Sequence, residues 1–249
     1  MPENTAPTPA PAPDPGPAPE RGPGPEPGHA VEPAGPPPAV RAQLLATEHW
    51  SLLASRSTTQ SEVLTRISMF LTLTSAGLLS LALVGQATGF TGLFPVFELS
   101  VLGFVTLVGV LTQVRVMNVG IEDLMYVIAM NRIRAGYLGL DPGLAPYLMS
   151  SPHDDRPGSE QTYFFFRNRR HASQFLGSSM VFIAAVNAAL AGLLTAAVAG
   201  TLTAPAPVTV GLGALAAVGY LAVALVRSGR RYFGLWTRYS PSFPTRPED

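Results

Sequence analysis

The segment SPHDDRPGSE, residues 151 to 160, places a histidine next to two aspartates, with a glutamate five residues further on. Imidazole and carboxylate groups are common ligands of divalent metal ions. His153, Asp154, Asp155 and Glu160 are therefore the candidate metal ligands of this chain. Adjacent side chains diverge in an extended backbone, however, and the segment lacks the helical spacing of a motif such as HExxH.

A second interpretation of the same segment needs no metal. Two prolines and Gly158 accompany the charged residues and are typical of a turn. The two aspartates would then be solvated and would balance Arg156 and Arg167. The choice between a metal site and a solvated turn depends on the elements that position the loop.

The composition is that of a chain only partly in water. Hydrophobic residues make up 47% of the 249 residues and charged residues 13%, about half the charged share of a typical soluble domain. The absence of cysteine excludes disulfides, thiolate nucleophiles and zinc-thiolate sites. Phosphate-binding, dinucleotide-binding and nucleophile-elbow motifs are also absent from the sequence, so we expect no cofactor and no enzymatic activity. The formal net charge is zero, and no nucleic-acid partner is expected.

The N-terminal segment, residues 1 to 38, contains 15 of the 25 prolines and almost no large apolar side chains. Such a segment cannot form a packed core, and its prolines favour an extended, polyproline II-like conformation. We expect a disordered tail. It would serve as a solvated spacer or bind a protein partner of the SH3 type.

Four apolar runs predict an all-α, four-helix transmembrane protein. Each has about 20 residues, enough to cross a hydrocarbon core of ~30 Å. The runs cover residues 67–87, 96–114, 175–199 and 208–226.

The first two spans are expected to continue as helices outside the membrane. Leu45, Leu52 and Val63 recur at near-heptad spacing before the first span, which predicts an amphipathic helix. The helix after the second span should end near Pro142 and Pro146. The chain then divides into a disordered tail (1–38), an amphipathic helix (39–66), a hairpin of spans (67–114), a helix and loop (115–174), a second hairpin (175–226) and a C-terminal tail (227–249).

The arginines predict the orientation in the membrane. All 16 basic residues are arginine, and the loops between spans one and two and between spans three and four contain none. Arginines flank the other span ends at positions 56, 66, 115, 132, 134, 167, 169, 170, 227, 230, 231 and 238. The positive-inside rule therefore predicts a plasma-membrane protein with both termini and the middle segment in the cytoplasm.

Few polar groups lie within the spans. Asn187 is expected to form an interhelical hydrogen bond, because an amide in lipid binds any available acceptor. Glu98 lies near the start of the second span and could form a charged ring at the mouth of a pore in a homo-oligomer. Small residues recur at spacings of three or four, and Gly103, Gly109 and Gly192 are candidate positions for close helix packing.

Two stretches carry a resemblance to known proteins. MNRIRAGYLGLDPGLAPYLMSSPHDD, residues 130 to 155, and EHWSLLASRS, residues 48 to 57, resemble segments of a family of four-span bacterial membrane proteins found mainly in actinobacteria. The similarity covers most of the chain after the proline-rich tail. The resemblance implies a four-span architecture; it implies no activity and no site residue.

Three functions fit these observations. The first is a non-enzymatic scaffold or interaction module whose partners are the lipid bilayer and other proteins. The second is an oligomeric ion channel or membrane-permeabilising effector. The third is a metal-dependent membrane enzyme that uses the loop of residues 153–160.

Overall fold

The computed structural model describes residues 16, 35–165, 177–202 and 204–246. The chain separates into two units, Met1–Pro37 and Pro38–Asp249, and every described helix belongs to the second unit. Most of the expected disordered tail lies outside the described residues, as do Arg167, Arg169 and Arg170.

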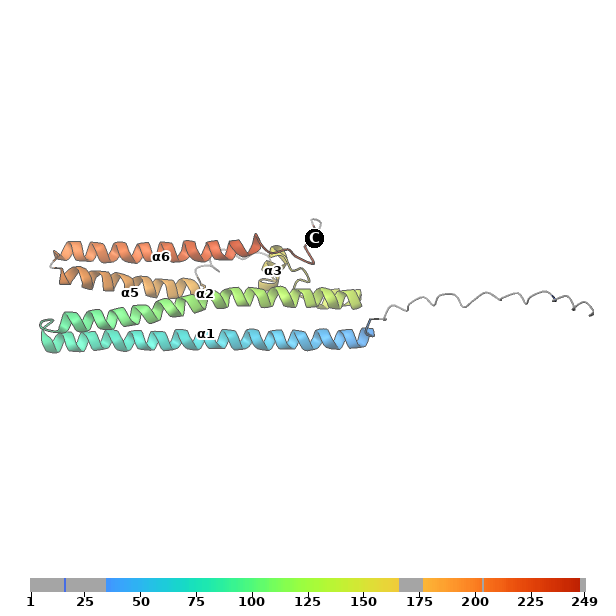
Figure 1. Cartoon of the computed structure of the whole chain (residues 1–249), viewed down its shortest axis with the longest axis horizontal. Coiled ribbons are helices and arrows are strands. Elements are labelled where there is room, and N and C mark those ends of the chain that lie inside the picture. The colour runs from blue at the N-terminus through green and yellow to red at the C-terminus, as the bar shows by residue number, and fades with distance from the viewer. Residues whose placement is uncertain (1–15, 17–34, 166–176, 203, 247–249) are drawn as a thin grey trace, which may run out of the picture. The chain divides into compact units, whose positions relative to one another are not determined.

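The predicted all-α fold is confirmed: the described residues contain helices and no strands (Figure 1). The elements are α1 (Pro38–Thr88), α2 (Phe94–Leu140), the 3-10 helix η1 (Pro142–Tyr147), α3 (Arg156–Tyr163), α5 (Ser179–Thr201) and α6 (Ala206–Trp236). Four of these, α1, α2, α5 and α6, are long and apolar enough to cross a membrane. The chain thus has the architecture of a multi-pass membrane protein.

Two of the four helices are far longer than a membrane requires. α1 has 51 residues and α2 has 47; at a rise of 1.5 Å per residue these correspond to about 76 Å and about 70 Å. Both lengths are more than twice the ~30 Å of a hydrocarbon core. We call the parts outside the apolar spans, residues 38–66 of α1 and 115–140 of α2, the stalk.

A short loop turns α1 back onto α2. Gly89, Phe90 and Gly92 have φ angles of 59°, 60° and 62°, so the loop uses left-handed backbone at three positions. The Phe90 ring covers Gly85, where any Cβ would collide with it, and meets Phe94 edge to face at 5.1 Å between ring centroids. This packing holds Phe90 in a conformation that is costly for a residue with a side chain.

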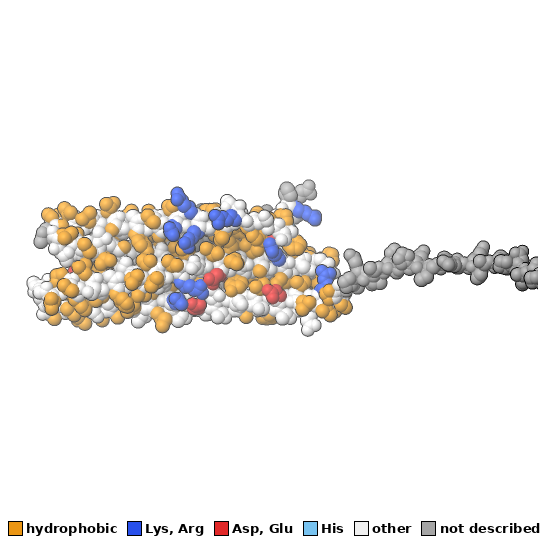
Figure 2. All heavy atoms as spheres, in the orientation of Figure 1, with side chains coloured by type: hydrophobic (Ala, Val, Ile, Leu, Met, Phe, Trp, Pro, Cys, Tyr) orange, Lys and Arg blue, Asp and Glu red, His pale blue; other side chains and the backbone are white. Residues whose placement is uncertain are grey.

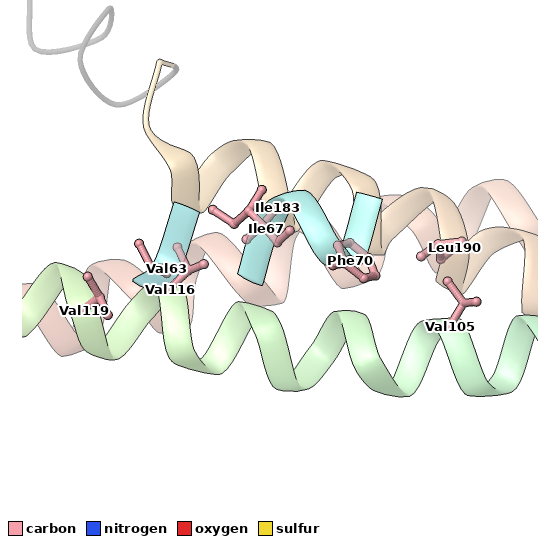
Figure 3. Packing of buried hydrophobic residues seen from close by; sticks show 8 residues of the cluster. All are labelled: Val63, Ile67, Phe70, Val105, Val116, Val119, Ile183 and Leu190. Carbon is pink, nitrogen blue, oxygen red and sulfur yellow. The ribbon is translucent and has the colours of Figure 1, made fainter. Parts of the chain in front are cut away.

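α2 is the central helix of the bundle, since it contacts both α1 and α5, while α5 also contacts α6. Its buried side chains meet those of α1 and α5 in one apolar cluster (Figure 3). The cluster consists of Val63, Ile67, Phe70, Val105, Val116, Val119, Ile183 and Leu190.

Glycines allow close contact at two helix interfaces. A Cβ added to Gly192 would lie 2.8 Å from the Gly213 carbonyl oxygen, and one on Gly213 would lie 2.9 Å from that of Gly192, so the α5 and α6 backbones touch. At Gly109 an added Cβ would collide with Asn187 and the Phe70 ring. At Gly103, the third glycine expected to allow close packing, a Cβ would meet nothing within 4 Å, so this position makes no close helix contact within the single chain.

α1 carries a stripe of small residues that faces outward. Ser68, Thr72, Ala76 and Ser80 lie four residues apart, and all four are exposed. The three hydroxyl groups donate to carbonyl oxygens one turn earlier in α1. Their polarity is therefore satisfied within their own helix.

Charged and apolar side chains occupy different parts of the surface along the length of α1 and α2. Arginine and carboxylate side chains gather in Figure 2 on the part away from the α1–α2 loop, and apolar side chains dominate the rest of the visible face. Within the apolar window of α6 only 11% of residues are buried. Such outward-facing apolar surface is what a lipid environment requires.

Candidate functional site

The loop of residues 151–155 contains a buried carboxylate. The Asp154 side chain is 0% exposed. Its Oδ2 accepts hydrogen bonds from Arg132 Nε at 2.6 Å, the Tyr239 hydroxyl at 2.7 Å and the Ser242 N–H at 2.9 Å, and its Oδ1 accepts from the Phe243 N–H at 2.7 Å. Both oxygens are thus occupied by donors of the protein.

Asp155 extends this arrangement. It is the N-cap of α3 and accepts from the Gly158 N–H at 2.9 Å. The same carboxylate accepts from the Thr245 N–H at 2.7 Å and the Thr245 hydroxyl at 2.9 Å. A Cβ at Gly158 would collide with the backbone of His153, so only glycine permits this turn. We call residues 239–245, held by Asp154 and Asp155, the C-terminal latch.

Asn131 joins the loop to α2. This side chain is 0% exposed, and its amide group donates to the His153 carbonyl oxygen at 2.7 Å. Its own oxygen accepts from Thr162 at 2.9 Å and from Arg134 at 2.6 Å. Together with the Arg132–Asp154 ion pair, these bonds connect the stalk, α3 and the C-terminal latch in one polar network.

Electrostatics favours the charged form of Asp154. Burial alone would raise the pKa of this carboxyl, but hydrogen bonds from Ser242, Tyr239, Phe243 and Arg132 outweigh it and lower the pKa to about 2. Burial and the bond to Asp154 raise the pKa of Tyr239 to about 12. Asp154 is therefore ionised and Tyr239 protonated throughout the physiological range.

The four candidate metal ligands are not brought together. Across the described ranges no group of three or more His, Asp, Glu or Cys side chains could hold a metal ion. Glu160 instead pairs with Arg156 at 2.8 Å, on the surface of α3. The solvated-turn prediction is wrong for Asp154, which is buried and pairs with Arg132. The predicted balance with Arg167 lies outside the described residues.

Asp123 is a second junction, where α1, α2 and α3 meet. Its carboxylate accepts from Arg56 at 2.6 Å, from Gln60 at 2.7 Å and from the Tyr163 hydroxyl at 2.6 Å. Burial opposes ionisation of Asp123, but the bonds from Arg56 and Tyr163 outweigh burial and lower its pKa. Burial and the bond to Asp123 raise the pKa of Tyr163 above its usual range.

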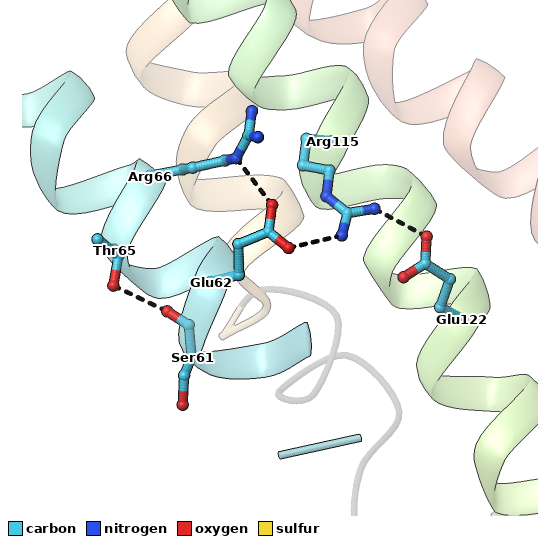
Figure 4. A network of polar contacts seen from close by, with 6 residues as sticks. All are labelled: Ser61, Glu62, Thr65, Arg66, Arg115 and Glu122. Carbon is cyan, nitrogen blue, oxygen red and sulfur yellow. Dashed lines mark hydrogen bonds and ion pairs between the residues drawn. The ribbon is translucent and has the colours of Figure 1, made fainter. Parts of the chain in front are cut away.

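A third set of charges lies where the stalk meets the apolar spans. Glu62 of α1 binds Arg66 at 3.0 Å and reaches across to Arg115 of α2 at 3.1 Å, and Arg115 also binds Glu122 at 2.8 Å (Figure 4). These groups are partly exposed, so each pair contributes little alone. Of the three pairs only Arg115–Glu62 joins α1 to α2, while the other two lie within a single helix.

Within the spans, the interhelical hydrogen bond expected of Asn187 is confirmed. The Asn187 amide is 0% exposed and donates to the Gly109 carbonyl oxygen at 2.8 Å and to Gln113 Oε1 at 2.7 Å. Tyr220 of α6 donates to the same Gln113 oxygen at 2.7 Å. One small polar cluster thus links α2, α5 and α6.

Glu98 lies near the loop end of the bundle. It lines a groove with residues of α1, α2, α5 and α6, among them Leu78, Phe94, Leu193 and Thr209. Most of the lining residues are apolar. Its carboxylate has no hydrogen-bond or ion-pair partner within the described part of the chain. Glu98 is therefore the ionisable side chain of the spans that stays open to a ligand or to lipid headgroups.

Only some of the residues in these sites could be predicted from sequence patterns. The order Asp155, Arg156, Pro157 is that of an N-cap followed by a first-turn proline, and this signal for α3 is present in the sequence. Asp123 and Tyr239 carried no such signal, because their partners lie on elements distant in the chain. No family model, curated protein or solved structure matches the chain.

Proposed function

We propose that this chain is a non-enzymatic scaffold of the cytoplasmic membrane, in which four spans anchor a rigid stalk that presents a binding surface to a protein partner. The observation that carries the proposal is the continuity of α1 and α2 from their spans into the stalk. The two halves of the stalk are joined by the Arg56–Asp123 and Arg115–Glu62 ion pairs. A stiff element of this kind holds a binding surface at a fixed distance from the bilayer.

The direction of the stalk follows from the arginines. Arg66, Arg115 and Arg227 stand at the ends of spans on the stalk side, and the loops at the other side contain no basic residue. The positive-inside rule then predicts that the stalk and both termini lie in the cytoplasm. Fusions at the C-terminus provide the test: green fluorescent protein should fluoresce there, and alkaline phosphatase should be inactive. The opposite pattern would overturn the orientation.

The binding surface that we propose lies on the outward side of α1. Trp50 is 72% exposed and Leu53 is 41% exposed, three residues apart on one side of the helix. The other side of α1 faces α2, where His49 stacks on Tyr137 and Leu45 covers Gly136. Exposed tryptophan outside the spans is typical of binding hot spots, since it buries a large area at low entropic cost.

A photo-crosslinking amino acid at position 50 tests this surface in cells. We expect a protein adduct of fixed size that disappears in the Leu53→Glu variant. The same amino acid at position 79, where Leu79 is 61% exposed in the span, is the matched control and should give no such adduct. An adduct of twice the chain mass would make the partner a second copy, and no protein adduct at position 50 would refute the scaffold.

Glu98 supports a second candidate, an oligomeric ion channel or permeabilising effector. Its carboxylate lines the groove at the loop end without a partner from the described residues. A ring of such groups would select cations. Ion flux from proteoliposomes should then fall in Glu98→Gln, and equal flux in the two proteins would remove Glu98 from this role.

A further inference from the structure

One face of α6 combines aliphatic and basic side chains where the helix leaves its apolar span. Ala222, Val223 and Val226 precede Arg227, Arg230 and Arg231, and the six residues line an open hollow. All six are exposed. Spacings of three and four residues place them on one side of the helix, with the apolar groups on the span and the charges just beyond it.

These three arginines differ from the five described arginines that bind a carboxylate. Arg56, Arg66, Arg115, Arg132 and Arg156 each bind at least one carboxylate within 3.1 Å. Arg227, Arg230 and Arg231 have no carboxylate or other hydrogen-bond acceptor within the described ranges, and basic side chains cluster over α6 in Figure 2. Three positive charges without a counter-ion among the described residues therefore lie close together where the apolar surface of α6 ends.

We propose that this face of α6 binds an anionic phospholipid of the surrounding bilayer. The phosphate of the headgroup would accept hydrogen bonds from the guanidinium groups of Arg227, Arg230 and Arg231. Guanidinium groups bind phosphate oxygens in a bidentate manner, which favours arginine over lysine at such a site. An acyl chain of the same lipid would lie along Val223 and Val226, which are 66% and 54% exposed.

Position and charge together favour a lipid over other anions. A soluble anion would use the arginines but leave the aliphatic half of the hollow uncovered. A neutral lipid would cover the aliphatic half but leave three positive charges without a counter-ion. An anionic phospholipid satisfies both halves, and the membrane supplies it at the depth where α6 changes from apolar to basic.

The test uses the full chain in nanodiscs that contain equal amounts of phosphatidylglycerol and phosphatidylcholine. Native mass spectrometry counts the lipids that stay bound on release. We expect phosphatidylglycerol to be retained in excess, the excess to fall about fivefold in Arg230→Gln, and to vanish when Arg227, Arg230 and Arg231 are all changed to Gln. The Arg230 side chain forms no hydrogen bond or ion pair within the described residues, so the single variant decides the question if the triple variant fails to fold.

The matched control changes the same net charge elsewhere. Arg41, Arg238 and Arg246 are exposed arginines outside the hollow, and the triple change to Gln should leave the excess of phosphatidylglycerol intact. If the excess of phosphatidylglycerol fell equally in this control, net charge alone would explain the effect, and the proposed site would be overturned. The site would also be overturned if the unaltered protein retained phosphatidylglycerol and phosphatidylcholine equally. Displacement of the bound lipid by millimolar inorganic phosphate would overturn it too.

Discussion

Asp154 and Tyr239 are 85 residues apart in the chain and are joined by a hydrogen bond of 2.7 Å. With Arg132 and two backbone N–H groups on the same carboxylate, this contact ties the C-terminal latch to the stalk. Asp154 and Asp155 therefore have a structural role, since their carboxylates hold the C-terminal latch.

Asp154→Asn should release the C-terminal latch. The substitution removes the charge that faces Arg132 and places amide hydrogens opposite Tyr239 and the Ser242 N–H, which costs about 2 kcal/mol. Trypsin cleavage after Arg238 should then be about 30-fold faster, since cleavage follows the population of the open form.

Glu160→Gln is the control for that experiment. Glu160 lies six residues after Asp154, on α3, and forms only an exposed pair with Arg156, one turn away on the same helix. Pairs of this kind contribute about 0.3 to 0.5 kcal/mol, so cleavage should change by less than threefold. Equal cleavage of Asp154→Asn and the unaltered protein would contradict the fastening role.

The latch should be stable to acid down to low pH. The native pKa of Asp154 is about 2, below its ordinary value of 3.8. A depressed native pKa adds stability that is fully present above the ordinary value and is lost as the pH falls towards 2. Trp236 lies edge to face with Tyr239 at 5.9 Å and can report this loss by fluorescence in a Trp50→Phe background. A transition near pH 6 would show that another group controls the latch.

Sequence patterns predicted the features that depend on neighbouring residues. The four spans follow from local composition, and the continuation of α1 through residue 66 follows from the lack of a helix breaker. The role of Asn187 was predictable because a buried amide in lipid has few alternatives.

Features that depend on tertiary contacts could not be predicted in this way. The burial of Asp154 results from Ser242 and Phe243, which lie 88 and 89 residues further along the chain. Gly103 and Gly109 looked equivalent, but six residues correspond to about 600° of helix rotation, so the two glycines are about 120° apart. Only Gly109 faces Asn187 and Phe70.

Asn187→Leu should weaken the contact between α5 and α2. The change keeps the number of side-chain heavy atoms and the branched shape but removes the hydrogen bonds to the Gly109 carbonyl oxygen and Gln113. Such bonds contribute about 0.6 to 2 kcal/mol in membrane proteins, and unfolding in mixed micelles with increasing dodecyl sulfate measures the loss. Thr195→Val is the control, because the Thr195 hydroxyl bonds only to Ala191 of its own helix. Equal stability of both variants would mean that packing alone joins the two helices.

Gly192→Ala should separate α5 from α6. The added Cβ would lie 2.8 Å from the Gly213 carbonyl oxygen and 3.1 Å from the Ala217 methyl group. Because the nearest atom is backbone, the helices must move apart, at a cost of about 1 to 3 kcal/mol. Thermal unfolding in detergent measures this loss.

Gly103→Ala is the matched control for that substitution, since its Cβ meets nothing within 4 Å. In a helix, alanine is favoured over glycine by about 0.8 to 1 kcal/mol, so Gly103→Ala should be neutral or stabilising while Gly192→Ala destabilises. If Gly103→Ala destabilised the protein more than Gly192→Ala, the α5–α6 contact would be looser than the approach of Gly192 to Gly213 indicates. Gly103 would then pack on a surface other than the described residues.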